Sequence, residues 1–308
     1  MKCYNMMNHH HLFIGEDVHL DQRFVSNELI HQCNFILILI FTRILDVGVH
    51  KAMVKKWGPN FYRKVLMSGG SAGTIFALAI ALGKDPDYMN ELYNSIAVNT
   101  LRYTPIYFGS YYMEVELKKL LSDPMAYKQI EGRCCFGTTA FFSKHRWHVS
   151  WDSNEDLIAC IQASYHIPLY CKWSAGIKGV ECVDGAYGFA GTDLPHGDQT
   201  LYVGIDPHAE ITRTLTHNEM FYPSIGEEYE AMVQSGYDQL TAWNGKMNKK
   251  VGSRVPNYSA LYVLWALKVF ENAVYSLLMT CQRTVLLLVA LITAISSLGS
   301  TVANLIAA

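Results

Sequence analysis

Residues 64–83 read KVLMSGGSAGTIFALAIALG, and the expected architecture of the chain follows from them. A short apolar run comes first, small residues then surround Ser71, and an uncharged apolar run of helical composition follows. This order predicts a buried strand, a tight turn and a helix. The turn carries the pattern G-x-S-x-G, made by Gly69, Gly70, Ser71, Ala72 and Gly73.

The turn has the features that a nucleophilic serine requires. Such a serine has a strained backbone and needs neighbours without bulk, and the four neighbours of Ser71 are all Gly or Ala. Its hydroxyl would stand at a helix N-terminus, where free N–H groups and the helix dipole favour a developing oxyanion. The pattern therefore predicts acyl transfer, with Ser71 as nucleophile and the Ala72 N–H as oxyanion donor. The alternative is a glycine-rich turn with an ordinary serine, because five-residue matches to this pattern also arise by chance.

The flanking sequence predicts an α/β fold. Residues 35–41 form an apolar run of strand length, and residues 46–56 have apolar positions at helical spacing before Gly58 and Pro59. Strand, helix, strand and helix in this order predict a parallel sheet with crossover helices. Further helices are predicted at 85–98, at 112–121 and after Ser153, and further strands at 134–142, 148–151 and 180–183.

Length, composition and charge limit the number of domains and the kinds of partner that this chain is expected to have. The chain has 308 residues, of which 50% are hydrophobic and 17% charged, with a formal net charge of −2. We expect one main domain and no nucleic-acid partner. The eight cysteines include no C-x-x-C pair, which predicts reduced thiols in a cytosolic domain. Three adjacent histidines, residues 9–11, lie in an expected N-terminal tail and do not predict a metal site.

A second candidate catalytic group follows the strand predicted at residues 180–183. Asp184 comes directly after it, and Gly185 and Ala186 allow a tight turn. Open α/β sheets place reactive groups at the carboxyl ends of their strands, so Asp184 is expected to face Ser71. The alternative is a turn aspartate that caps its own backbone, which is the usual role of Asp-Gly.

Three motifs together resemble the patatin-like phospholipase family. They are GGSAGT at 69–74, ASYHIP at 163–168 and DGA at 184–186. DSNEDLI at 152–158 is similar to a motif of the branch that contains adipose triglyceride lipase and adiponutrin. The resemblance implies a three-layer α/β sandwich with a mostly parallel central sheet.

The resemblance also implies a mechanism. The family uses a serine–aspartate dyad, which here would be Ser71 as nucleophile and Asp184 as proton acceptor. A carboxylate can take this proton if it lies within hydrogen-bond reach in a water-poor pocket. The implied reaction is hydrolysis of a lipid acyl ester, in an acylglycerol or a phospholipid, through an acyl-serine intermediate. This chemistry needs neither a metal nor an organic cofactor.

One part of the sequence departs from the family pattern. A glycine-rich oxyanion loop is expected between the first strand and the first helix, where residues 41–53 read FTRILDVGVHKAM. Gly48 and Val49 resemble the end of the family segment, but residues 42–45 replace the earlier glycines. Loss of one oxyanion donor typically lowers the rate about 10²- to 10³-fold. Either the chain is a weak or inactive relative that binds lipid or a partner at a membrane, or the sequence before residue 46 is not the biological one.

A histidine-based mechanism is also open. Asp184 is followed by His196, His208 and His217, which gives the Ser, Asp, His order of α/β-hydrolases. One of these histidines would then be the base. All three lie in polar stretches typical of exposed loops, which favours solvated side chains.

The domain order is read from the changes in composition. We expect a tail at 1–30, the acyl hydrolase domain at 31–225, a polar and basic connector at 226–258, and a membrane-associated helical region at 259–308. The expected partners are a lipid acyl ester and a membrane or lipid-droplet surface.

The last part of the chain predicts a membrane anchor. No residue from Thr284 to Ala308 is charged, and this length spans a hydrocarbon core of about 30 Å. We expect a transmembrane helix near 284–306, with the catalytic domain on the cytosolic side because basic residues precede it. Residues 260–279 are expected to lie at the interface with Lys268 and Glu271 outward. The alternative is an amphipathic or core helix.

Overall fold

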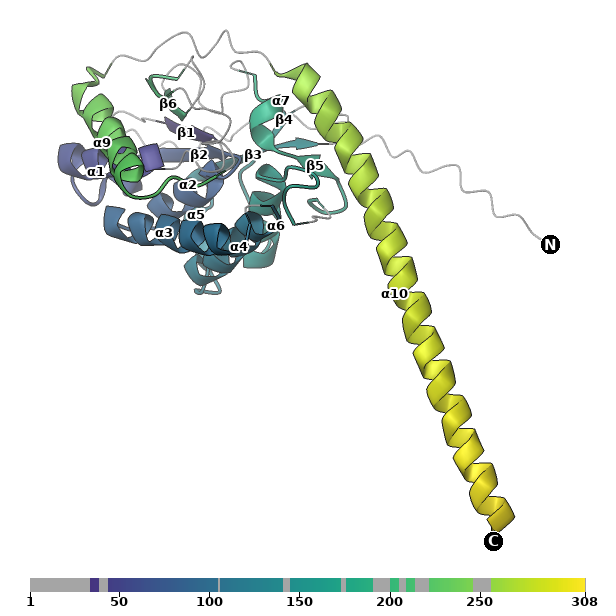
Figure 1. Cartoon of the computed structure of the whole chain (residues 1–308). Coiled ribbons are helices and arrows are strands. Elements are labelled where there is room, and N and C mark those ends of the chain that lie inside the picture. The colour runs from purple at the N-terminus through teal and green to yellow at the C-terminus, as the bar shows by residue number, and fades with distance from the viewer. Residues whose placement is uncertain are drawn as a thin grey trace. The chain divides into compact units, whose positions relative to one another are not determined.

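The computed structural model describes residues 34–38, 44–104, 106–140, 145–172, 176–190, 200–204, 209–213, 222–245 and 256–307. These residues form a mixed α/β domain and a long C-terminal helix (Figure 1). The predicted α/β class is therefore confirmed.

The strands among these residues form one seven-stranded sheet. Its order is β4-β3-β2-β1-β6-β7, and β5 pairs with β3 outside this path. The strands are β1 (Asn34–Ile38), β2 (Leu66–Gly70), β3 (Cys134–Ala140), β4 (His145–His148), β5 (Cys182–Val183), β6 (Thr200–Gly204) and β7 (Ile211–Thr212). Pairing is parallel from β3 through β2, β1 and β6 to β7, whereas β4 and β5 lie antiparallel to β3. The mostly parallel sheet is as predicted.

The helices begin and end where local sequence signals place them. They are α1 (Ile44–Trp57), α2 (Gly73–Ala81), α3 (Pro86–Arg102), α4 (Phe108–Leu120), α5 (Ala126–Ile130), α6 (Asn154–Ser164), α7 (Gly185–Gly188), α9 (Glu227–Ala242) and α10 (Tyr258–Ala307), with a 3₁₀ turn at Phe61–Arg63. The Asp85 carboxylate caps α3 by accepting the Tyr88 N–H at 2.7 Å, and the Ser153 hydroxyl oxygen caps α6 by accepting the Asp156 N–H at 3.2 Å. Both caps satisfy N–H groups that a helix start leaves free.

The sheet has apolar side chains on both faces. Leu201 and Val203 of β6 belong to the main core, to which α1 to α6 and α9 all contribute. Tyr202, between them, points to the other face and packs with Ala186 of α7 and with Phe189, the residue that follows α7. Most of the described helices therefore cover one face, and α7 covers part of the other. Six cysteines lie in the described residues; all are free and five are buried, as predicted for reduced core thiols.

The strand predicted at 148–151 is wrong in register. β4 is His145–His148, and its residues pair with β3 so that His148 lies opposite Phe136. Trp147 packs on Phe189 with ring centroids 5.9 Å apart, on the face of the sheet that α7 covers, and this contact favours the observed register. Trp151 has left the strand and packs on Phe136, at 5.2 Å between centroids, just before α6.

The strand predicted at 180–183 is shorter than expected. Ile177 and Val180 exchange backbone hydrogen bonds of 2.9 and 2.8 Å and so form a tight turn of their own. Only Cys182 and Val183 remain to pair with β3. β5 nevertheless ends directly before Asp184, as predicted.

The range 226–258, expected as a polar connector, contains the helix α9. Its buried residues are Tyr229, Met232, Val233, Gly236 and Leu240, which recur at helical spacing. α9 lies against α1 with almost no space between the backbones, because a Cβ at Gly48 would overlap the Val233 carbonyl oxygen. The packed domain thus extends beyond residue 225.

The first half of α10 is oriented opposite to expectation. Lys268 and Glu271, predicted to face outward, are only 0% and 7% exposed, because they pair with each other and with His166. Tyr262 and Phe270, on the other side of the helix, are 65% and 58% exposed. Leu261, Leu264 and Trp265 pack on Val183 on the inner side.

Within the described residues, one stretch has the length and composition of a membrane-crossing helix. It is Tyr258–Thr284, with a mean hydropathy of 1.3 and 28% of its most apolar window buried against the protein. The anchor predicted near 284–306 is helical in its backbone, and most of its side chains lie outside the described set. The structure therefore contains the predicted apolar C-terminal helix.

A buried histidine predicts loss of stability in acid. His50 in α1 is 2% exposed and lies edge-on to Phe61, at 5.7 Å between centroids. Burial lowers the pKa of His50 to about 4, against an opposing effect of Asp85. Between about pH 6.5 and pH 4 the unfolded chain binds a proton that the folded chain does not, so stability falls as the pH falls through this window.

His50→Leu is expected to remove this contribution. Between pH 7 and pH 4.5 the variant should lose about 2–3 kcal/mol less free energy of unfolding than the wild type, because a leucine side chain has no proton to bind. Urea unfolding at the two pH values measures the difference. Equal losses in both proteins would assign the acid sensitivity to other groups.

Candidate active site

Ser71 lies on a strained turn between β2 and α2. Its φ angle is 55°, in the left-handed region that non-glycine residues seldom adopt and that costs about 1–3 kcal/mol. The turn is held from both sides. The Ser71 carbonyl oxygen accepts a hydrogen bond from the Thr74 hydroxyl at 2.7 Å, and a Cβ at Gly69 would lie 2.6 Å from the Thr74 Cα. The small residues of G-x-S-x-G are therefore what lets α2 fold back onto β2.

Strand pairing brings Asp184 to the same place. β2 pairs with one edge of β3 as far as Gly137, and there the chain turns away at Ser71. β5 occupies the continuation of that edge, because Thr139 pairs with Val183 on one side and with β4 on the other. β5 runs antiparallel and ends at Val183, so Asp184 arrives opposite the point where β2 stops. Two chain reversals, one after each strand, thus meet beside β3.

The two side chains are in direct contact. The Ser71 hydroxyl donates a hydrogen bond of 2.5 Å to Oδ2 of Asp184, and both residues are 0% exposed. Oδ1 of Asp184 accepts the Ala186 N–H at 2.8 Å. Short hydrogen bonds of a hydroxyl to a carboxylate are among the stronger ones in proteins. The predicted juxtaposition of Ser71 and Asp184 is therefore present.

The backbone of Asp184 is held as firmly as its side chain. Its carbonyl oxygen accepts the Thr139 hydroxyl at 3.1 Å, and its N–H donates to the His166 carbonyl oxygen at 2.9 Å. The chain then passes so close to β3 that a Cβ at Gly185 would overlap the Gly137 carbonyl oxygen. The D-G-A motif is thus explained by a close approach as well as by a turn.

This arrangement has the requirements of a nucleophile and its base. A carboxylate in contact with a serine hydroxyl can accept its proton as the oxygen attacks. Ala72 is the N-cap of α2 and Gly73 is its first residue, and within the described part of the chain their N–H groups donate to no other group. These amides lie at the positive end of the helix dipole, where an oxyanion would be stabilised.

The residues compared above with the oxyanion loop have different positions. Gly48 lies inside α1 against α9, so its lack of a side chain serves helix packing. Ile44 and Leu45 form the first turn of α1 and are buried. Thr42 and Arg43 lie outside the described residues.

The structure does not describe the other candidate residues. His196, His208 and His217 lie outside the described residues, as do the histidines at 9–11. In the described ranges no group of three or more His, Cys, Asp or Glu side chains is arranged to hold a metal ion.

Two residues that the sequence analysis did not single out contact the backbone of Asp184: Thr139 and His166. Lys268 and Glu271 in turn contact the His166 side chain. Thr139 contacts the Asp184 backbone through its side-chain hydroxyl and His166 through its carbonyl oxygen, and neither long-range contact leaves a local signal in the sequence. Lys268 and Glu271 did give a signal, as two opposite charges three residues apart in an apolar helix, but the helix pattern alone did not tell which way they face.

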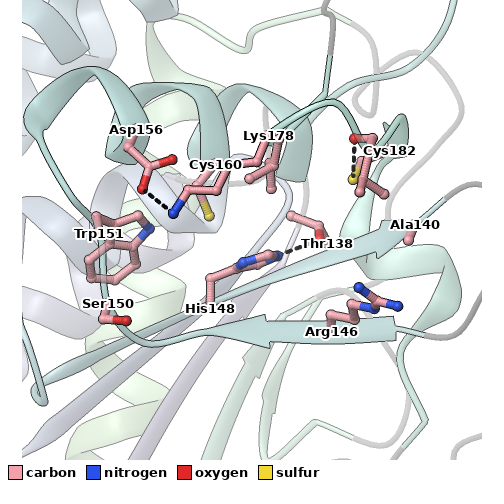
Figure 2. A pocket seen from close by; sticks show the side chains of 12 residues that line it. Thr138, Ala140, Arg146, His148, Ser150, Trp151, Asp156, Cys160, Lys178 and Cys182 are labelled. Carbon is pink, nitrogen blue, oxygen red and sulfur yellow. Dashed lines mark hydrogen bonds and ion pairs between the residues drawn. The ribbon is translucent and has the colours of Figure 1, made fainter. Parts of the chain in front are cut away.

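A cavity of about 190 Å³ lies near the site without including the dyad (Figure 2). Its lining includes Thr138, Arg146, His148, Asp156, Lys178 and Cys182. Burial, together with the charge of Arg146, lowers the pKa of His148 to about 4, and this imidazole pairs with the Thr138 hydroxyl at 2.9 Å. Thr138 and Thr139 are neighbours in β3, so their side chains point to opposite faces of the sheet. The cavity, which Thr138 lines, therefore lies on the face opposite to the hydrogen bond between Thr139 and Asp184.

Comparison with known proteins gives distant structural matches only. No known family profile and no curated protein matches the sequence. The structure is similar to VipD from Legionella pneumophila, with 10% identity, a TM-score of 0.44, and 68% of this chain and 66% of that chain covered. It is also similar to full-length ExoU of the Pseudomonas aeruginosa type III secretion system in complex with SpcU. Here the identity is 12% and the TM-score 0.34, with 68% of this chain and 52% of that chain covered. The match thus spans between about half and two thirds of the length of these structures.

Proposed function

We propose that this chain is a patatin-like hydrolase of lipid acyl esters, with Ser71 as nucleophile and Asp184 as its base. The observation that carries the proposal is the 2.5 Å hydrogen bond between these two fully buried side chains. Each lies on a turn made of small residues, and the turns carry the GGSAGT and DGA motifs. ASYHIP, between them, supplies the carbonyl oxygen that binds the Asp184 N–H.

The mechanism follows from the contacts of the two side chains. Ser71 Oγ bonds to the acyl carbon while its proton passes to Oδ2 of Asp184, and the Ala72 N–H stabilises the oxyanion. The ester C–O bond then breaks, and the leaving alcohol takes the proton from Asp184. A water molecule then gives a proton to the same carboxylate as its oxygen bonds to the acyl carbon. The bond from this carbon to Ser71 Oγ breaks, Oγ takes the proton back from Asp184, and the fatty acid leaves. The cycle as proposed requires no cofactor.

We assign the substrate to lipids because of the helix that lies beside the site. In its first part α10 buries the charges of Lys268 and Glu271 and exposes apolar side chains, the reverse of a helix adapted to water. The exposed set includes Tyr258, Tyr262, Val263, Val269, Phe270, Val274, Leu277, Leu278 and Leu286. Such a surface fits a membrane or lipid-droplet interface, and the uncharged residues that follow fit an anchor near 284–306 with the catalytic domain on the cytosolic side. Assignment of this chain to the branch that contains adipose triglyceride lipase and adiponutrin rests on the DSNEDLI motif alone.

A second candidate is a non-catalytic lipid-binding relative. It is favoured by one observation: Gly48 is used for packing of α1 on α9, so no glycine-rich loop has been identified before α1 as a second oxyanion donor. Such a protein would keep the fold and the apolar surface of α10 without hydrolysis.

Hydrolysis assays decide between the two candidates. The purified full chain is mixed with phospholipid vesicles and with triacylglycerol emulsions, and released fatty acid is measured beside the Ser71→Ala variant. The proposal expects release by the wild type and none above background by the variant. Vesicle binding by both proteins without release by either would favour the non-catalytic candidate.

A further inference from the structure

A buried ion pair within α10 contacts His166 of the ASYHIP segment. Lys268 is 0% exposed, and its Nζ lies 2.9 Å from Oε2 of Glu271 and 3.3 Å from Nε2 of His166. The same Glu271 oxygen lies 3.1 Å from His166 Nε2. Buried charges are unfavourable unless they are paired, and an apolar contact of the same shape is often more stable. Stability alone therefore does not explain why an ion pair occupies this position.

The carboxylate of Glu271 binds ASYHIP and its following residue at two points. One oxygen contacts His166, and the other accepts the Leu169 N–H at 2.9 Å. Burial alone would raise the pKa of Glu271, but the contacts with His166, the Leu169 N–H and Lys268 outweigh it and lower the pKa to about 2. The group is ionised at physiological pH. Leu169 has a φ angle of 66°, a conformation that surrounding contacts must hold.

The segment held by Glu271 in turn holds Asp184. The His166 carbonyl oxygen accepts the Asp184 N–H at 2.9 Å. Val183, just before it, packs on Leu261, Leu264 and Trp265 of α10. Tyr187, just after it, accepts the Asn257 N–H at 2.9 Å through its carbonyl oxygen. The chain around Asp184 is thus held at three points. Val183 packs on α10, Asp184 binds the His166 carbonyl oxygen, and Tyr187 binds Asn257 directly before α10.

We propose that Lys268 and Glu271 are positioning residues of the hydrolase: they fix His166, and through its carbonyl oxygen they keep the Asp184 carboxylate aligned with Ser71. This inference rests on the proposed roles of Ser71 and Asp184. It makes the C-terminal helix part of the architecture of the catalytic site. The helix that presents an apolar face to the lipid surface is then the same one that sets the geometry of the base.

The test separates positioning from folding with neutral replacements. Glu271→Leu or Lys268→Met alone leaves one buried charge unpaired and is expected to weaken the fold. The double variant Lys268→Met/Glu271→Leu removes both charges and should recover stability, but it has no group to hold His166 or the Leu169 N–H. Ile130→Ala is the control for lost stability, since Ile130 is fully buried in α5 near the start of β3.

The readout is the inactivation of Ser71 by a fluorophosphonate in the full-length protein. The double variant is expected to react about 10- to 100-fold more slowly in the covalent step, with the probe affinity within about twofold of the wild type. Ile130→Ala should react at the wild-type rate while folded. A stable double variant that reacts at the wild-type rate would overturn the inference and leave the proposed function intact.

A second measurement keeps the inference testable if the wild type does not react at all. That result would contradict the proposed function. Amide hydrogen exchange of residues 182–187 then reports directly whether α10 holds the Asp184 segment. Faster exchange in the double variant than in the wild type and in Ile130→Ala would support the positioning contact, and unchanged exchange would overturn it.

Discussion

Asp184→Asn is expected to lower kcat for ester hydrolysis about 10²- to 10⁴-fold while KM changes little. The amide oxygen of the introduced asparagine can still accept one of the two side-chain hydrogen bonds, from Ser71 or from the Ala186 N–H. It cannot take the serine proton. The backbone contacts to Thr139 and His166 do not involve the side chain and should persist. Steady-state kinetics with a soluble acyl ester measure kcat and KM, and urea unfolding measures whether the fold persists.

The control is Asp156→Asn, the same chemical change at an aspartate outside the dyad. Asp156 lines the cavity and pairs with Lys178 at 3.3 Å. This variant should keep kcat within about twofold, since Asp156 contacts Lys178 and the Asp152 N–H and neither contact reaches Ser71. An Asp184→Asn protein that hydrolyses at more than half of the wild-type rate would place the base elsewhere, with His196, His208 and His217 as the next candidates.

Gly185→Ala is expected to damage both fold and activity. The added methyl would overlap the Gly137 carbonyl oxygen, an atom of the sheet backbone that cannot move without disturbing β3. Overpacking of this kind costs about 3 kcal/mol or more when backbone must shift. Because Asp184 precedes this glycine, its carboxylate would be displaced from Ser71 and activity should fall more than about 10²-fold.

Gly204→Ala provides the matched control. A Cβ there would lie 3.5 Å from the nearest atom, Cε2 of Tyr202, which is an ordinary contact. It should unfold at nearly the same urea concentration as the wild type and keep its activity. If Gly185→Ala and Gly204→Ala proved equally stable, the close approach of the Asp184 turn to β3 would not be a determinant of the fold.

The elements around the dyad were predictable because their signals are local. The glycines beside Ser71 and the apolar runs on either side specify strand, turn and helix, and the structure has β2 and α2 there. Asp184 was predictable in the same way, from a strand ending in Asp-Gly. Their meeting also follows from topology, since both strands lie on one edge of β3.

The errors arise where distant contacts decide. β4 begins three residues earlier than predicted, because pairing with β3 and packing of Trp147 on Phe189 outweigh the local pattern. α9 belongs to the packed domain because it packs on the distant helix α1, where Gly48 lies against the Val233 carbonyl oxygen. The charges of Lys268 and Glu271 point inward because His166, which lies 105 residues before Glu271, gives them a buried partner.

Fluorophosphonate labelling of the purified full chain, followed by peptide mass spectrometry, tests the central claim most directly. The probe reports an activated serine and requires no knowledge of the natural lipid. The account predicts a label on Ser71 that is absent from Ser71→Ala and sharply reduced in Asp184→Asn. A folded wild-type protein that takes no label, or takes it on another residue, would contradict the account.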